Sequence, residues 1–125
     1  MRRRAEVLVD TSVWADHFRA RDADLTALLA QGAVRMHSFV IGELAMGNLR
    51  DRARTIDLLQ AVPGVATIDD WAWHDFVAEE QLAGSGLGFV DAHLLAAARM
   101  AGVYLWTRDR RLAEHATRLG CGWDR

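Results

Sequence analysis

Four acidic residues stand where their sequence neighbours are almost entirely apolar. Asp10 ends the run VLV, Asp109 closely follows the run VYLW, Glu43 lies within FVIGELAMG, and Asp91 lies within GFVDAHLLAAA. An unpaired buried carboxylate is costly and tends to become protonated. A hard divalent cation removes that cost, and Mg²⁺ and Mn²⁺ prefer oxygen ligands. If these four side chains meet in the fold, they predict a metal site.

Each acid also has a purely structural interpretation. Asp10 and Asp109 would serve as caps of the helices that follow them. Asp91 would be stabilised in the first turn of a helix by the helix dipole, and Glu43 would simply face water. Capping does not explain carboxylates inside two strongly apolar helices, however. Taken together, the four positions therefore favour a shared site.

The hydrophobic pattern predicts the elements that position these acids. Short apolar runs predict strands at 7–9, 33–36, 65–68 and 103–106, with a short edge strand at 121–123. Helical patterns lie between the strands, including 39–46 with Ser38 as its N-cap, 50–62 and 89–101. Strands that alternate with helices indicate a three-layer α/β fold, in which a central parallel sheet of four to five strands has helices on both faces. Parallel strands then bring Asp10 and Asp109 to the same edge of the sheet.

Length and composition indicate one globular domain over residues 1–125. Hydrophobic residues make up 51% of the chain and charged residues 26%, and no window approaches the length needed to span a bilayer. The basic start at residues 2–4 precedes an apolar run too short for a signal peptide, so we expect a cytoplasmic protein without a membrane partner. Cys121 stands alone, which excludes a disulfide framework.

All 15 basic residues are arginines. The lack of lysine excludes Schiff-base chemistry, a phosphate-binding P-loop and a phospho-receiver module. A net charge of −2 argues weakly against nucleic-acid binding, but metal-bound carboxylates would no longer count toward it. Arg108, Arg110 and Arg111 beside Asp109 then become candidate phosphate contacts, although a solvated helix start explains them equally well.

The glycine-rich stretch 84–88 interrupts the helical pattern. It is interpreted either as a flexible connector or as a loop in which backbone must approach a ligand closely. The five histidines show no metal-binding spacing, and we expect none of them to be a ligand.

At these acidic segments the chain resembles the PIN-domain ribonucleases, and more closely the VapC-type toxins of bacterial toxin–antitoxin pairs. The matching pieces are VLVDTSVWADHF, FVIGELAMGNL, GLGFVDAHLLAAA and LWTRDRRLA, in the family's order and over nearly the full length. The resemblance implies a PIN-like fold with an acidic metal pocket. It maps the family's four acidic positions onto Asp10, Glu43, Asp91 and Asp109. Ser12 and Thr107 match small polar positions that support these acids.

The resemblance also implies a hydrolase that uses one or two Mg²⁺ or Mn²⁺ ions to cut RNA, leaving a 3′-hydroxyl and a 5′-phosphate. Asp10 and Asp91 would be the main ligands, with Glu43 and Asp109 acting directly or through water. Many relatives carry a further acid shortly after the fourth, but Arg110 and Arg111 stand here, which favours one tightly held ion. The implied partners are a cognate antitoxin and a second copy in a homodimer.

Two other functions are compatible with parts of the sequence. A metal-dependent phosphatase would use Asp10 as its nucleophile, but its pattern requires a second Asp where Ser12 stands. A non-catalytic PIN-like scaffold that binds RNA or protein would not need all four acids. If the acids converge, we expect Asp10→Asn to raise the melting temperature by relieving repulsion.

Overall fold

The computed structural model describes residues 5–124, so the basic residues 2–4 of the signal-peptide argument lie outside it. In chain order its elements are β1 (Val7–Val9), α1 (Thr11–Arg19), α2 (Ala23–Ala30), β2 (Val34–Arg35), α3 (Ser38–Ala45), α4 (Arg52–Ala61), α5 (Asp70–Glu79), α6 (Phe89–Ala101), β3 (Tyr104–Trp106) and α7 (Arg110–Arg118). Within this part of the chain, no helix combines the length and apolar character needed to cross a membrane.

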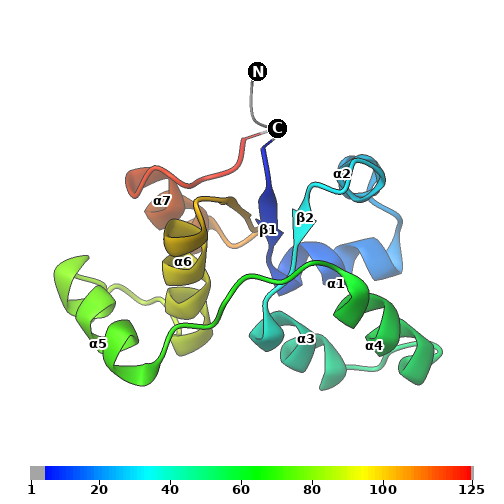
Figure 1. The fold of residues 1–125 in the computed structure, drawn as a ribbon, viewed down its shortest axis with the longest axis horizontal. Helices are drawn as coiled ribbons and strands as arrows, with labels where there is room; N and C mark the ends of the chain where they lie inside the picture. The colour runs from blue at the N-terminus through cyan, green and yellow to red at the C-terminus, as the bar shows by residue number, and fades with distance from the viewer. Residues whose placement is uncertain (1–4, 125) are drawn as a thin grey trace.

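The three strands form a parallel sheet in the order β2-β1-β3. Val7 of β1 lies opposite Val34 on one side and Tyr104 on the other. Consecutive side chains of a strand point to opposite faces of the sheet, and all three residues of β1 are 0% exposed. Both faces of the sheet are therefore covered, which confirms the predicted α/β class. Figure 1 shows α1 to α4 on the β2 side of β1, with α6 and α7 on the β3 side.

Within residues 5–124 the sheet has three full strands, and the outer segments predicted to complete four to five strands pair only briefly with it. Two outer segments join it through single parallel bridges, Met36 with Gly64 and Leu105 with Gly122. The predicted strand at 65–68 is wrong, because the chain leaves the sheet after Val65 donates to the carbonyl of Met36 at 2.8 Å. Thr67 lies beside α3 instead, where its hydroxyl is 3.1 Å from that of Ser38.

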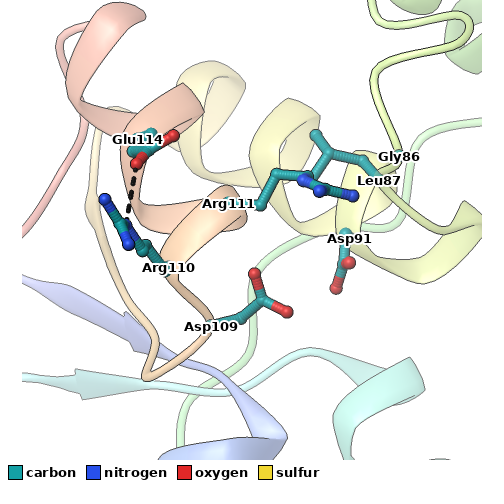
Figure 2. A pocket seen from close by; sticks show the side chains of 7 residues that line it. All are labelled: Gly86, Leu87, Asp91, Asp109, Arg110, Arg111 and Glu114. Carbon is teal, nitrogen blue, oxygen red and sulfur yellow. Dashed lines mark hydrogen bonds and ion pairs between the residues drawn. The ribbon is translucent and has the colours of Figure 1, made fainter.

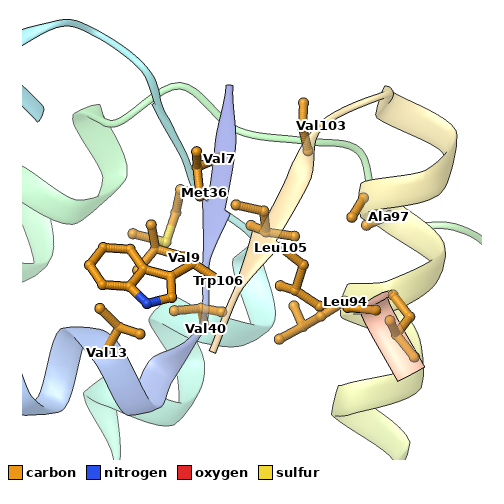
Figure 3. Close-up of a cluster of buried hydrophobic side chains, with 14 of the residues drawn as sticks. Val7, Val9, Val13, Met36, Val40, Leu94, Ala97, Val103, Leu105 and Trp106 are labelled. Carbon is orange, nitrogen blue, oxygen red and sulfur yellow. The ribbon is translucent and has the colours of Figure 1, made fainter. Parts of the chain in front are cut away.

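The core lies between the sheet and α6, which begins and ends where the sequence predicts. Residues 92–98 of α6 are all buried, and four of them are alanines whose small side chains let the helix lie close to β3. Figure 3 shows Leu94 and Ala97 facing Leu105 across this interface. Each fully buried aliphatic side chain contributes about 2 kcal/mol to folding, so this contact fixes α6, and with it Asp91, relative to the sheet.

Candidate active site

Asp10 follows β1 directly and is only 6% exposed. Its Oδ1 accepts a hydrogen bond from the backbone N–H of Thr11 at 2.7 Å, so Asp10 is the N-cap of α1. Its Oδ2 accepts from the hydroxyls of Thr107 at 2.7 Å and Ser12 at 2.9 Å. The capping interpretation of Asp10 is thus correct. The carboxylate is also held by hydrogen bonds from residues that follow two strands, β1 and β3.

Ser12 and Thr107 connect Asp10 to the turn before α7. The Ser12 oxygen accepts from the N–H of Arg108, and the Thr107 oxygen accepts from the N–H of Asp109, each at 3.0 Å. Each hydroxyl therefore accepts a hydrogen bond from a backbone N–H and donates its own hydrogen bond to Asp10. Both residues support the acid as the sequence predicts.

Asp109 is the N-cap of α7, where its Oδ1 accepts from the N–H of Leu112 at 2.9 Å. Glu43 lies on the exposed side of α3, and its Oε1 accepts from the hydroxyl of Thr11 at 2.7 Å. Thr11 was not among the residues predicted from the sequence. Its position directly after Asp10, at the turn from strand to helix, could have indicated this role, because side chains at such turns contact neighbouring segments.

Asp91 lies in the first turn of α6, and its Oδ2 accepts a long bond of 3.4 Å from the N–H of Gly88. Burial raises the pKa of Asp91, and the charges of Asp10, Asp109 and Glu43 raise it further. Charges act over short distances in salt solution, so this effect means that the four acids share one neighbourhood. Segments more than 90 residues apart in the chain contribute to it.

A cavity of about 490 Å³ opens beside these acids. Figure 2 shows the carboxylates of Asp91 and Asp109 pointing into the same space, with Arg111 reaching from α7 toward Gly86 above them. The remaining lining residues are Leu87, Arg110 and Glu114. The cavity thus has acids on its floor and an arginine across its upper side.

The donor set fits a hard divalent cation in its chemistry, because it offers carboxylate oxygens and concentrates negative charge around Asp91. Between residues 5 and 124, however, no three acidic, histidine or cysteine side chains lie close enough to form a complete ligand set. A bound ion would have to draw the carboxylates closer together. Metal ligation by these four acids therefore stays a prediction.

The three arginines after Thr107 differ in their contacts. Arg108 donates to Asp16 and Asp22, each at 2.7 Å, and its guanidinium carbon lies 5.7 Å from the centre of the Trp106 ring. Its guanidinium thus ties α1 and the turn after it to β3, an internal role that differs from the predicted phosphate contact. Arg110 pairs with Glu114 at 3.2 Å on the surface of α7. Arg111 lines the cavity.

Residues 7–117 match the PIN domain in a comparison with protein families. The chain therefore belongs to the PIN-domain family, as its parallel sheet and acidic edge already indicated. Among curated proteins, Ribonuclease VapC32 of Mycobacterium tuberculosis, found in two strains, is 43% identical over 107 residues, covering 85% of this chain and 86% of the relative. This similarity confirms the resemblance to VapC-type PIN-domain ribonucleases.

Among solved structures, PAE2754 from Pyrobaculum aerophilum has a similar fold. Its TM-score is 0.63 at 19% sequence identity, and the match covers 93% of this chain and 96% of the other. At this identity the similarity supports the fold alone.

Proposed function

We propose that this chain is a Mg²⁺- or Mn²⁺-dependent endoribonuclease that hydrolyses phosphodiester bonds and acts as the toxin of a toxin–antitoxin pair. The observation that carries the proposal is that the carboxylates of Asp91 and Asp109, from separate segments, point into one cavity. Asp10 and Glu43 lie near enough for their charges to raise the pKa of Asp91. Similarity to a protein named Ribonuclease VapC32 supports the substrate class.

Asp10 and Asp91 would be the main ligands of the ion, with Glu43 and Asp109 binding it directly or through water. Bound there, a divalent ion would supply the charge that polarises the scissile phosphate and acidifies the attacking water. The chain's own contribution is to hold the carboxylates in place. Ser12 and Thr107 fix the Oδ2 atom of Asp10, and Thr11 holds Glu43. Either Glu43 or Asp109 would orient the water.

We further propose a cytoplasmic protein that forms a homodimer and is inhibited by a cognate antitoxin. A basic side chain of the antitoxin placed among the carboxylates would compete with the metal ion and cover the cavity. The name of the curated VapC relative supports the antitoxin partner.

The proposal is tested with purified protein on mixed single-stranded RNA and DNA, with Mg²⁺, with Mn²⁺ or with a chelator. We expect the wild-type protein to cut RNA only with the divalent ion, and Asp91→Asn to lose cleavage. Cleavage in the chelator, or full activity of Asp91→Asn, would contradict the proposal. RNA binding without cleavage would indicate the scaffold instead, and release of inorganic phosphate from a monoester would indicate the phosphatase. Sequencing of fragment 5′ ends after brief expression would identify the RNA that is cut.

A further inference from the structure

Arg111 is the one arginine of the 108–111 turn that lies on the cavity and keeps its donors free of an ion pair within residues 5–124. Arg108 is engaged by two aspartates, and Arg110 by Glu114. Three neighbouring arginines therefore have three different environments. Arg110 and Arg111 both line the cavity that holds Asp91 and Asp109, but Arg110 is paired with Glu114, whereas Arg111 has no acidic partner among the described residues.

Gly86 makes room for this side chain. A Cβ atom at residue 86 would collide with Nη1 of Arg111 and would lie 2.9 Å from its Cζ. Gly84 of the same loop offers a contrast, since it also has a positive φ, +75° against +88°, yet a Cβ there would meet nothing within 4 Å. A close approach to backbone thus occurs at Gly86, but the approaching group is the guanidinium of Arg111 and not the ligand expected from the sequence.

We propose that Arg111 binds a phosphate of the RNA substrate beside Asp91 and Asp109, and that Gly86 favours this position because it lets the guanidinium lie against the loop. The proposal deepens the proposed ribonuclease function and rests on it. A planar guanidinium binds phosphate oxygens with two parallel hydrogen bonds. The carboxylates of the cavity repel the phosphates of an RNA backbone. The positive charge of Arg111, on the opposite side of the cavity, offsets this repulsion for the RNA that enters.

The first test measures binding of labelled single-stranded RNA by fluorescence anisotropy, in a chelator and again with Ca²⁺. We expect Arg111→Gln to weaken binding roughly tenfold, and to lower the slope of log affinity against log salt by about 0.7. Arg118→Gln is the matched control, since it removes the same charge from the far end of α7, where Arg118 lies beside Glu80 and does not line the cavity, and it should change affinity less than about twofold. Arg111→Lys should restore part of the affinity.

Wild-type affinity in Arg111→Gln, or an equal loss in Arg118→Gln, would overturn the proposal. Failure of the wild-type protein to bind RNA in both buffers would overturn it as well. Melting temperatures of all variants show whether each one is folded.

The second test uses Gly86→Ala against Gly84→Ala. Both substitutions place a methyl group at a positive φ and should lower the melting temperature similarly, but only Gly86→Ala displaces the guanidinium. We expect Gly86→Ala to weaken RNA binding and Gly84→Ala to leave it unchanged. In the Arg111→Gln background, Gly86→Ala should add no further loss, because coupled residues are not additive. Equal losses from the two glycine variants, or full additivity with Arg111→Gln, would contradict the role of Gly86.

A cleavage assay on the same proteins separates this inference from the function on which it rests. If the wild-type protein cuts RNA and Arg111→Gln binds RNA with unchanged affinity, the inference is wrong and the ribonuclease function stands. Binding that depends on Arg111 in a wild-type protein that cuts no RNA would remove the ribonuclease assignment and leave the phosphate contact.

Discussion

Asp10 is a buried carboxylate that accepts three hydrogen bonds, from Thr11, Ser12 and Thr107. Asp10→Asn replaces one accepting oxygen by an amide group that only donates. We therefore expect RNA cleavage to be lost and the free energy of unfolding to fall by about 1–3 kcal/mol. Urea unfolding in a chelator measures the change, with Asp57→Asn on the exposed side of α4 as control. An increase in stability would contradict this prediction and support the expectation from sequence alone, which considered only repulsion.

Asp91 is held by one long bond, and burial and then the neighbouring acids raise its pKa. Neutralisation should therefore help rather than harm the metal-free protein. We expect Asp91→Asn to raise the free energy of unfolding by about 0.5–1 kcal/mol, a few degrees in melting temperature.

The pH dependence of the free energy of unfolding also tests whether the charged form of Asp91 destabilises the metal-free protein. The folded protein binds more protons than the unfolded chain between the ordinary pKa of 3.8 and the raised value. The contribution of Asp91 to stability therefore grows as the pH falls through that window. Asp91→Asn should lack this contribution, and a lower stability than wild type at neutral pH in a chelator would refute the prediction.

At the scale of elements, the start of α3 depends on a buried histidine. Ser38 was predicted as the N-cap, but His37 has that role, with its Nδ1 accepting from the N–H of Phe39 at 3.0 Å. Burial, and then the charge of His93, lower the pKa of His37 to about 4. The cap accepts a hydrogen bond only while this nitrogen is unprotonated, so the helix start and the protonation state are linked.

We expect stability to fall as the pH drops from 6.5 toward 4. The unfolded chain binds a proton at His37 in that range, whereas the folded protein does not. The loss attributable to His37 should reach about 3 kcal/mol. His37→Asn keeps an N-cap acceptor and should flatten this part of the curve of unfolding free energy against pH. The same slope in both proteins would assign the effect to other groups.

The strands and helices were predictable to different degrees. β1 and α6 were predicted almost to the residue because the short apolar run of β1 ends sharply at Asp10, and the long apolar run of α6 ends at Gly102. The strand predicted at 65–68 is absent, although the structure describes all of these residues. Its four-residue apolar pattern gave no information that Thr67 would pack beside α3. The three arginines after Thr107 were equivalent in sequence. Only the fold decides which of them meets Asp16 and Asp22.

At the scale of the molecule, folding and metal binding should be coupled. A divalent ion that binds the folded chain alone stabilises it, by about 1.4 kcal/mol at ten times its dissociation constant. We expect Mg²⁺ or Mn²⁺ to raise the melting temperature of the wild-type protein and of Asp57→Asn, and to have little effect on Asp91→Asn. A metal response of wild-type size in Asp91→Asn would remove Asp91 from the ligand set.

The neighbourhood of the site was predictable from topology, because parallel strands bring Asp10 and Asp109 to one edge. Its detailed contacts were not. The role of Thr11 and the space at Gly86 both depend on side-chain directions that a single sequence does not give. The same is true of the distances among the carboxylates, which within residues 5–124 are longer than a complete ligand set requires.

The groups that fix Asp10 come from opposite ends of the chain, since Thr107 and β3 lie nearly a hundred residues after β1. During translation, the first strand leaves the ribosome long before the strand that must lie beside it. A growing polypeptide therefore has no place where all four acids can gather. The acidic centre is completed only after the ribosome has added Asp109, so a nascent chain that stops before this residue carries no finished centre.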